Sequence, residues 1–340
     1  MTKAAELAKM GEVLTNSQIG GRRNIAINGA MQVAQRATSV TGLGATSGYY
    51  TLDRFRSAFG NTAGRLTMTQ TADGPSGFAN CLKYDCTTAD TSLAVNEYLI
   101  LSQYFEGQDL QGLKKGTSDA EKVTVSFYVK GNGNATYMCE LFDGDNTRHN
   151  TQQFAVTSSW NRISLTFDGD TTGAYDDDNA LSLYLNFWLH AGSSYTGGTY
   201  TANTWASNTN GNRAVGISSF FSSTDNTFFI TGLQLELGSQ ATPFEHRSFG
   251  EELALCQRYF RNVDTMNPTY LFTVRSADDI RRLSHVFSTM RSAPTCTIGA
   301  TQEGTVSAQG TGKDSVQFTV TGQSTSDASA IHDYTLDSEL

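Results

Sequence analysis

The chain has 340 residues, a formal net charge of −9 and 17% charged residues. Four prolines and 11% aromatic residues exclude a disordered or linker-dominated protein, and the length suits two domains that each bury a core. The acidic excess leaves no basic stripe, so we expect no nucleic-acid partner. The sequence contains no run of about 18 apolar residues and residues 1–16 lack an apolar core, so we expect no membrane insertion and no signal peptide.

The N-terminal segment is expected to form a short amphipathic helix followed by extended chain. Residues 3–15 carry three apolar side chains at helical spacing, Leu7, Met10 and Leu14. Such a helix needs a packing partner, because isolated helices of about 12 to 15 residues are marginal. Arg22 and Arg23 follow on a glycine-rich backbone, and we interpret them as docking groups for carboxylates of a neighbouring protein. A solvated turn is the alternative.

The five cysteines are widely spaced and odd in number: Cys81, Cys86, Cys139, Cys256 and Cys296. The absence of a C-x-x-C pair gives no indication of a metal or redox centre. A disulfide between Cys81 and Cys86 is an alternative, but a chain of this size does not need one. We therefore predict free core thiols.

An all-β domain is predicted for residues 45–247. Apolar and polar residues alternate through 123–129, 163–167 and 181–189, and the intervening segments are rich in Gly, Asn, Asp, Ser and Thr. Several such strands without intervening helices favour a two-sheet sandwich. Trp160 and Trp188 lie in alternating strand context, so we expect both to fill its core.

One inter-strand loop has part of the pattern of a calcium-binding loop. Asp168, Asp170 and Asp176 offer oxygen ligands, and Gly173 occupies the sharp-turn position. Asn179 replaces the bidentate Glu at the last position, and the flanking elements are strands. We therefore predict no metal and no other cofactor, with calcium at the three aspartates as the alternative.

A single linking helix is predicted at residues 248–262. Ser248 and Glu251 have the spacing of a capping box. Charged residues cluster around this point: Glu245, His246, Arg247, Glu251 and Glu252. They could surround a general base, but capping and the helix dipole account for the same residues, so we interpret the cluster as structural.

A second, smaller β domain is predicted at residues 263–340. Strand-like segments occur at 269–274, 285–290, 295–301 and 314–322, the last alternating through Val316, Phe318 and Val320. A domain of this size is marginal alone, so oligomerisation would stabilise it. The expected fold class is all-β, with the domains 1–44 (N-terminal anchor helix and extended segment), 45–247 (sandwich), 248–262 (linking helix) and 263–340 (C-terminal β tip).

Sugar recognition commonly stacks an aromatic ring on a pyranose while polar side chains bind the hydroxyls. Six aromatic residues fall in predicted loops: Tyr49, Tyr50, Tyr175, Tyr195, Tyr200 and Trp205. We take four of them as candidates for glycan binding, namely Tyr175, Tyr195, Tyr200 and Trp205. The alternative is that they are ordinary surface aromatics.

Two long motifs resemble bacteriophage tail-fibre and virion-fibre proteins. Residues 22–55, with RRNIAINGAMQVAQRATS and GYYTLDRF, resemble the opening of these fibres, and residues 233–260, LQLELGSQATPFEHRSFGEELALCQRYF, resemble the end of their first β domain. VTVSFYVKG and SSWNRISLTFDGD look like strands of jelly-roll carbohydrate-binding modules. FSTMRSAPTCTI, residues 287–298, is similar to the start of the C-terminal tip domain in the same fibres.

The resemblance implies a non-enzymatic, homotrimeric tail fibre. Its jelly-roll domain and tip would face the host surface and bind a glycan, while its N-terminus would attach to other tail or adaptor proteins. The expected location is the virion, after synthesis in the host cytoplasm. The lack of a long shaft keeps a head, capsid or collar fibre open as an alternative, whereas a polysaccharide depolymerase would need paired carboxylates that are not marked in the sequence.

Overall fold

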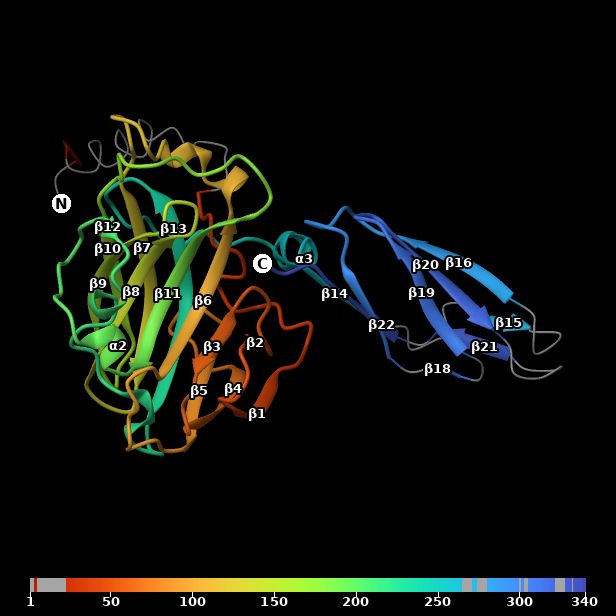
Figure 1. Cartoon of the computed structure of the whole chain (residues 1–340), viewed down its shortest axis with the longest axis horizontal. Coiled ribbons are helices and arrows are strands. Elements are labelled where there is room, and N and C mark those ends of the chain that lie inside the picture. Colours follow the sequence, from red (N-terminus) through yellow and green to blue (C-terminus); the bar gives the residue numbers. More distant parts are fainter. Residues whose placement is uncertain are drawn as a thin grey trace. The chain divides into compact units, whose positions relative to one another are not determined.

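The computed structural model describes residues 3–4, 23–264, 271–273, 280–299, 301–302, 305–321, 328–331 and 333–340. The chain divides into unit 1, which contains Met1–Gln32 and Ala37–Arg247, and unit 2, which contains Val33–Arg36 and Ser248–Leu340 (Figure 1). Within the described part of the chain, no helix has the length and apolar character required to span a membrane.

Unit 1 is a sandwich of two antiparallel sheets with jelly-roll topology. Sheet A has the strand order β1 (Ser39–Leu43), β4 (Arg65–Thr71), β5 (Cys81–Thr88), β13 (Thr227–Leu237), β7 (Val123–Gly131), β10 (Asn161–Phe167). Sheet B has the order β12 (Ala206–Ser207), β9 (Arg148–Val156), β8 (Ala135–Asp143), β11 (Leu181–Ala191), β6 (Tyr98–Glu106), β3 (Arg56–Gly60), β2 (Gly48–Tyr49). The prediction of an all-β sandwich is confirmed.

Short helical turns occur in the connections of unit 1. They are η1 (Gly107–Asp109), η2 (Gln111–Leu113), α2 (Ser193–Thr196), η3 (Asn210–Asn212) and η4 (Phe220–Ser222). The connections pass repeatedly between sheets, since β6, β7, β8, β10 and β11 lie in B, A, B, A and B respectively. Segments that are distant in sequence therefore meet at the two ends of the sandwich.

Aromatic side chains fill the space between the two sheets. Phe127 of β7 contacts Phe154 of β9 and Phe187 of β11, with ring centroids 5.0 Å apart in both pairs and interplanar angles near edge-to-face. Leu183 and Leu185 of β11 are also buried. The alternation read in the sequence therefore places one side of β7 and β11 in the core, as expected from the two-residue period of a strand.

The two tryptophans expected in that core lie elsewhere. Trp188 is 1% exposed, but it belongs to the outward side of sheet B and is buried in a separate cluster with Ile100 and Met138. Trp160 is only half-buried and packs against Phe229, with ring centroids 6.2 Å apart. Alternation alone does not show which side of a strand is covered by a loop, and this is why the prediction was wrong.

The expected boundary at residue 44 is also corrected, because residues 23–32 and 37–44 belong to unit 1, while Val33–Arg36 belong to unit 2. β1 is the edge strand of sheet A, paired with β4. Asn24 is 1% exposed; its side-chain amide donates to Leu233 O and its Oδ1 accepts from the backbone N–H of Leu235. Backbone pairing of residues far apart in sequence makes the segment inseparable from the sandwich.

Unit 2 begins with the linking helix. Helix α3 (Phe249–Gln257) has Ser248 as its N-cap, and the reciprocal hydrogen bonds with Glu251 confirm the predicted capping box. The helix is shorter than predicted, because the chain enters β14 (Phe260–Asp264) and Phe260 pairs with Asp337.

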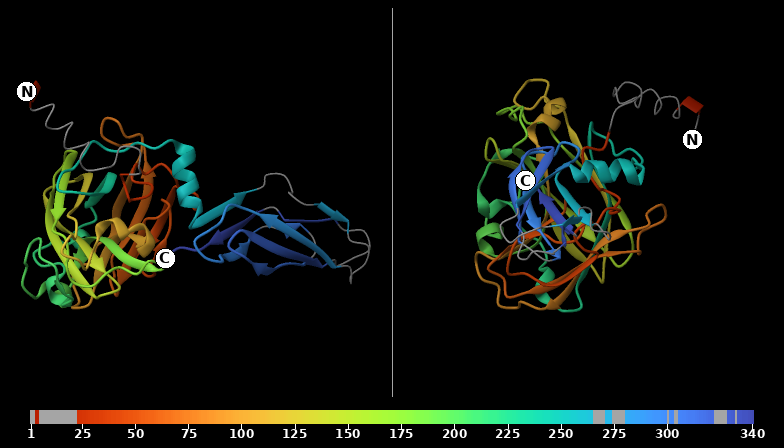
Figure 2. Two further views of the ribbon diagram at one scale, coloured as in Figure 1. Left: turned by 90° about the horizontal axis from the view of Figure 1, so that it is seen from above. Right: turned by 90° about the vertical axis from the view of Figure 1, so that its right-hand side faces the viewer.

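The described strands of unit 2, coloured blue in Figure 2, form three small antiparallel sheets. Their orders are β14, β22 (Asp333–Asp337), β17 (Thr295–Ile298); β15 (Leu271–Thr273), β21 (Ala328–Ile331), β18 (Thr301–Gln302); and β16 (Ile280–Val286), β20 (Ser315–Thr321), β19 (Thr305–Thr311). Met290, Val316, Phe318, Tyr334 and Leu336 form the buried cluster. The strands expected at 295–301 and 314–322 are present as β17, at 295–298, and β20, at 315–321, whereas that expected at 285–290 lies earlier, at 280–286.

All five cysteines are free thiols. Cys81 and Cys86 lie on the same strand, β5, where residues five apart are roughly 16 Å from each other and face opposite sides. A disulfide between them is therefore excluded by strand geometry, which confirms the prediction of free thiols.

Candidate functional site

Three aromatic rings lie side by side on the outward side of sheet B. Tyr184 of β11 is the cross-strand neighbour of Tyr104 on β6 and of Phe142 on β8. The ring centroids are 4.7 Å apart for Tyr104 and Tyr184, and 5.4 Å apart for Phe142 and Tyr184. Tyr184 and Phe142 are half-buried and Tyr104 is 8% exposed. We call these three residues, together with Arg56 and Arg213, the Tyr184 face.

The two arginines flank the aromatic row. Arg56 Nη1 donates to Tyr104 Oη at 3.0 Å, and the Arg213 guanidinium lies 4.5 Å from the centroid of the Phe142 ring. Burial raises the pKa of Tyr184, and the positive charges of Arg213 and Arg56 act in the opposite direction, which shows that both lie near its ring. The face thus combines π surfaces with cationic N–H donors.

A polar row beside the aromatic rings is fully connected. Ser102 Oγ donates to Asn186 Oδ1 at 2.7 Å, and Asn186 Nδ2 donates to Glu140 Oε2 at 2.9 Å. Arg213 binds Glu140 through Nε and Nη2, at 2.6 and 2.9 Å. Burial alone would raise the pKa of Glu140, but the charge and hydrogen bonds of Arg213 outweigh it, so this pKa is lowered. The network holds Arg213 rigidly beside the rings.

The adjoining part of the outward side of sheet B is covered by the chain between β11 and β13. Tyr195 packs on Trp188, with ring centroids 5.1 Å apart, and Tyr200 Oη accepts a hydrogen bond from the backbone N–H of Gln153 at 3.0 Å. Both tyrosines are half-buried members of the cluster that contains Ile100 and Met138. Tyr195 and Tyr200 therefore cover this part of the outward side of sheet B.

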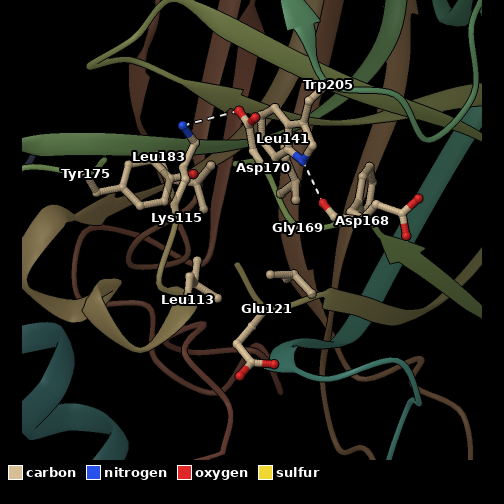
Figure 3. A pocket seen from close by; sticks show the side chains of 12 residues that line it. Leu113, Lys115, Glu121, Leu141, Asp168, Gly169, Asp170, Tyr175, Leu183 and Trp205 are labelled. Carbon is tan, nitrogen blue, oxygen red and sulfur yellow. Dashed lines mark hydrogen bonds and ion pairs between the residues drawn. The ribbon is translucent and has the colours of Figure 1, made fainter. Parts of the chain in front are cut away.

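The other two candidate aromatics line one small hollow (Figure 3). Trp205 is half-buried and its indole N–H donates to Asp168 O at 2.7 Å. Tyr175 is only 7% exposed, and burial raises its pKa well above the ordinary value. The expectation that Tyr175 is an exposed loop aromatic is corrected, since a ring buried this far does not present a face for stacking.

Lys115 occupies the centre of the loop that was considered for calcium. Its Nζ pairs with Asp170 Oδ2 at 3.3 Å (Figure 3) and with Asp143 Oδ2 at 2.6 Å, and it donates to Thr172 O and Gly173 O, both at 2.7 Å. The ammonium group therefore takes the position and the oxygen ligands that a loop cation would have.

Asp168, Asp170 and Asp176 do not converge on a common point. Asp170 also accepts two hydrogen bonds from Arg148, at 2.7 and 3.1 Å, while Asp168 pairs with the exposed Lys122 at 2.6 Å. Burial raises the pKa of Asp170, but the Arg148 hydrogen bonds and the Lys115 charge outweigh it, so the pKa is lowered. Asp168 and Asp170 are therefore neutralised by side chains from other segments.

The charged cluster before α3 closes unit 1 onto its own N-terminal segment. The Glu245 carboxylate accepts from the backbone N–H groups of Arg23 and Asn24, at 3.3 and 2.6 Å, and pairs with Arg247 at 3.5 Å. His246 packs against the Phe78 ring, with centroids 5.2 Å apart. These contacts give Glu245, His246 and Arg247 structural roles.

Of the predicted docking residues, Arg23 alone lies in the described part of the chain. Besides its backbone contact, its Nη1 donates to Thr242 Oγ1 at 3.3 Å. Leu7, Met10, Leu14 and Arg22 lie outside the described residues, as does most of the predicted N-terminal helix, of which Lys3 and Ala4 are described as helical.

Sequence reasoning missed the Tyr184 face, although a signal was present. In LSLYLNFWLH, the positions between the core leucines are Tyr184, Asn186 and Trp188, an aromatic-rich second side for one strand. That pattern indicates a covered or ligand-binding outer side. The neighbours Tyr104 and Phe142 come from strands about 80 and 40 residues earlier, respectively, and only strand pairing brings them together.

No protein-family model matches the sequence, and no curated protein matches it. Solved structures with similar chain traces include a family 4 carbohydrate-binding module ("CBM4 structure and function"), with 10% identity, a TM-score of 0.32 and coverage of 62% of this chain and 97% of that chain. The family 11 carbohydrate-binding module from Clostridium thermocellum has 13% identity, a TM-score of 0.29 and coverage of 61% and 99%.

The enzymatically active domain of tailspike protein 4 from bacteriophage CBA120 has 13% identity and a TM-score of 0.31, with coverage of 63% of this chain and 21% of that chain. At such low identities and TM-scores, these likenesses carry no inference about ligand or activity.

Proposed function

We propose that unit 1 is a carbohydrate-binding module and that the Tyr184 face is its sugar site. The observation that carries the proposal is the pair of half-buried rings Tyr184 and Phe142 on the outward side of sheet B, which continue the row of the buried Tyr104 ring, with a guanidinium at each end of the row. Phe127 and Phe187, by contrast, pack against each other between the sheets. A pyranose stacks its C–H face on such rings and offers hydroxyls to adjacent N–H donors.

The arginines fit the role of hydroxyl donors. Arg213 is fixed by Glu140, which reduces the entropy lost when a ligand is bound. Arg56 directs one N–H at Tyr104 and presents a planar group with further donors beside the rings. Half-buried aromatic rings with rigid donors beside them are the arrangement expected for a neutral or acidic oligosaccharide.

A glycan array on the purified full chain identifies the sugar, and isothermal titration then measures its affinity for variants. Tyr184→Ala should lower the affinity about 5- to 150-fold, since loss of a stacking ring costs on the order of 1 to 3 kcal/mol and each 1.4 kcal/mol is a factor of about ten. Trp160→Ala is the matched control, because Trp160 is a half-buried aromatic on the outward side of sheet A.

Trp205→Ala distinguishes a sugar site at the Tyr184 face from a sugar site in the hollow shown in Figure 3, because Trp205 lines that hollow. Loss of binding in Trp205→Ala with normal binding in Tyr184→Ala would move the site to the hollow. A glycan array without any bound sugar would contradict the carbohydrate-binding function itself.

For the whole chain, we infer a subunit of a bacteriophage tail fibre that adsorbs to a host-surface glycan. The support is the resemblance of residues 22–55 and 233–260 to virion-fibre proteins. The N-terminal segment would attach to the particle, and a homotrimer would gain avidity from three weak sites. Light scattering should give three times the 36.8 kDa chain mass, and a stable monomer would contradict the trimer.

Antibody labelling of particles under the electron microscope tests the placement. Label at the tail supports the tail fibre, whereas label on the head would replace it with a decorative head fibre. The proposal contains no catalytic step, because the carboxylate at the Tyr184 face, Glu140, is bound by Arg213. Release of reducing sugar from a host polysaccharide would contradict this and favour a depolymerase.

A further inference from the structure

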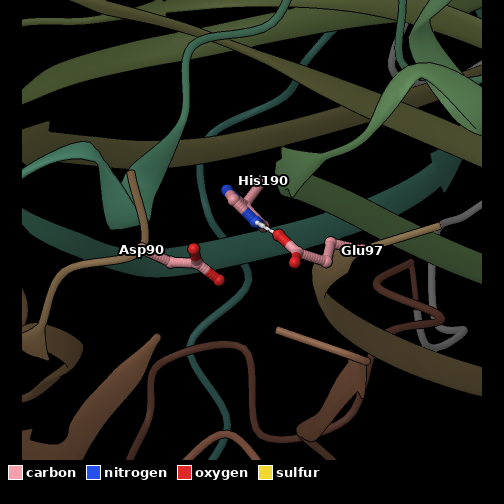
Figure 4. A group of neighbouring side chains, drawn as sticks. All are labelled: Asp90, Glu97 and His190. Carbon is pink, nitrogen blue, oxygen red and sulfur yellow. Dashed lines mark hydrogen bonds and ion pairs between the residues drawn. The ribbon is translucent and has the colours of Figure 1, made fainter. Parts of the chain in front are cut away.

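A second cluster of chemically active side chains lies away from the Tyr184 face. Asp90 and Glu97 belong to the connection between β5 and β6, and His190 lies near the end of β11 (Figure 4). One ligand atom from each residue can be chosen so that all three atoms lie within 4.8 Å of one another. The described residues contain this one group of at least three such side chains.

All three side chains are removed from solvent. His190 is 0% exposed, Glu97 is 4% exposed and Asp90 is 6% exposed. Figure 4 shows the imidazole and the two carboxylates pointing toward a common centre. His190 Nε2 lies 3.4 Å from Glu97 Oε2, which is longer than the roughly 2.7 to 2.9 Å of a charge-assisted hydrogen bond. Two ligands on one ion at about 2.0 to 2.2 Å are separated by comparable distances.

Neighbouring groups hold the three side chains in place. Asp90 Oδ2 accepts from Thr62 Oγ1 at 2.9 Å and from the backbone N–H of Ala63 at 2.7 Å. The other ring nitrogen of His190, Nδ1, is 2.8 Å from Ser219 Oγ, and its ring packs on Phe221. A second partner on the distal nitrogen orients histidines that bind metals.

The cluster lacks a strong cation of its own. Among the described residues, the cluster has one ion pair, between His190 and Glu97. No lysine or arginine of these residues pairs with Asp90 or Glu97. Two buried carboxylates beside an imidazole are costly unless a positive species joins them.

From this geometry we propose that Asp90, Glu97 and His190 form a structural site for one divalent transition-metal ion of the Zn²⁺ or Mn²⁺ type. An imidazole with two carboxylates suits these ions, whereas calcium and magnesium prefer oxygen ligands alone. Because the site is buried, the ion would tie the β5–β6 connection to the end of β11, and it would have no contact with a substrate.

The experiment uses the full chain after removal of metal with EDTA. Isothermal titration with Zn²⁺ and with Mn²⁺, followed by elemental analysis after gel filtration, should give one ion per chain. The melting temperature should rise by several degrees with the ion bound, because the ion binds the folded state alone. Co²⁺ added in place of Zn²⁺ should give visible absorption bands of a mixed nitrogen and oxygen site.

His190→Gln should weaken the affinity by at least about 100-fold, since even loss of a group that orients a ligand costs 10- to 100-fold. His149→Gln is the matched control: His149 is 4% exposed, lies on β9 in the same sandwich and is outside the cluster, so the variant should bind the ion normally. Glu97→Gln keeps the shape of the side chain and should also lose the ion, which guards against a His190 variant that fails to fold.

The proposal is overturned if the metal-free chain binds less than about one-tenth of an ion, or if its melting temperature does not respond to Zn²⁺ or Mn²⁺. Equal loss of binding in His149→Gln and His190→Gln would also overturn it. If a proton shared between Asp90 and Glu97 neutralises the cluster instead, Glu97→Gln would raise the melting temperature and added metal would have no effect.

Discussion

Two buried clusters of acidic side chains in unit 1 differ in whether the chain itself provides a cation to neutralise them. Asp143 and Asp170 surround Lys115, whose Nζ also binds two backbone carbonyls, and Arg148 adds a second cation. Asp90 accepts hydrogen bonds from neutral groups of Thr62 and Ala63, and the ion pair that the described residues give this cluster is the one between Glu97 and His190. A buried carboxylate must be neutralised, so the first cluster is complete within the chain, while the second is the one for which we propose a metal ion.

The comparison also shows how an apparent metal loop can be misread. The loop with Asp168, Asp170 and Asp176 has calcium-like spacing, yet a lysine that precedes it by 55 residues reaches its centre. The Asp90 cluster has no recognisable spacing, because His190 comes from a strand 93 residues after Glu97. Local spacing therefore suggested a metal site in the loop, where Lys115 already supplies the positive charge. It gave no indication of the cluster of Asp90, Glu97 and His190.

The largest effect is expected from removing the internal cation of the first cluster. Lys115→Met leaves Asp143 and Asp170 buried with Arg148 alone, so the free energy of unfolding should fall by about 3 to 5 kcal/mol. Urea unfolding measures the loss. Lys122→Met, which removes an exposed lysine with a similar ion pair to Asp168, should change stability by less than about 0.5 kcal/mol. An equal loss of stability in Lys115→Met and Lys122→Met would contradict the role of Lys115 as the cation that neutralises the buried cluster.

A smaller loss is expected at the third buried acid, Glu140. Arg213→Met removes its cation, but Asn186 and Trp188 still donate hydrogen bonds to the carboxylate. We therefore expect the free energy of unfolding to fall by about 2 to 3 kcal/mol, less than for Lys115→Met. The same urea titration provides the ranking, and a larger loss than in Lys115→Met would contradict it.

The pH dependence of stability should identify the self-neutralised acids. The pKa values of Glu140 and Asp170 are lowered in the folded state, so the unfolded chain binds more protons at acidic pH. Their contribution is complete above the unfolded values of about 3.9 to 4.3 and is lost as the pH falls through the lower folded values. The stability difference between the parent and Glu140→Gln should therefore shrink from pH 6 to pH 3 in urea unfolding. A difference that is independent of pH would contradict this assignment.

The smallest effect concerns the cysteines. Burial raises the pKa of Cys81 and Cys86 to about 11, so both remain protonated and react slowly in the folded chain. A reducing agent should leave the melting temperature unchanged, and a thiol reagent at pH 8 should label these cysteines only after unfolding. A shift of several degrees on reduction would show a disulfide and contradict the free thiols.

Part of the fold and a smaller part of the candidate site could be predicted from the sequence. The strands β7, β10 and β11 and the capping box of α3 follow from patterns within about ten residues, which local propensity and the two-residue period determine. Their neighbours could not be predicted in the same way. Tyr184 meets Tyr104 and Phe142 only because β11 pairs with β6 and β8.

The sequence by itself determined an all-β chain, the sandwich and the start of the linking helix, because alternation and capping are properties of short segments. The tertiary structure decided which side of each strand is covered, and it buried Trp188 under a loop while leaving Tyr184 half-exposed. It also decided which cation reaches each buried acid. Burial and charge depend on contacts between segments far apart in the chain, and no local pattern contains that information.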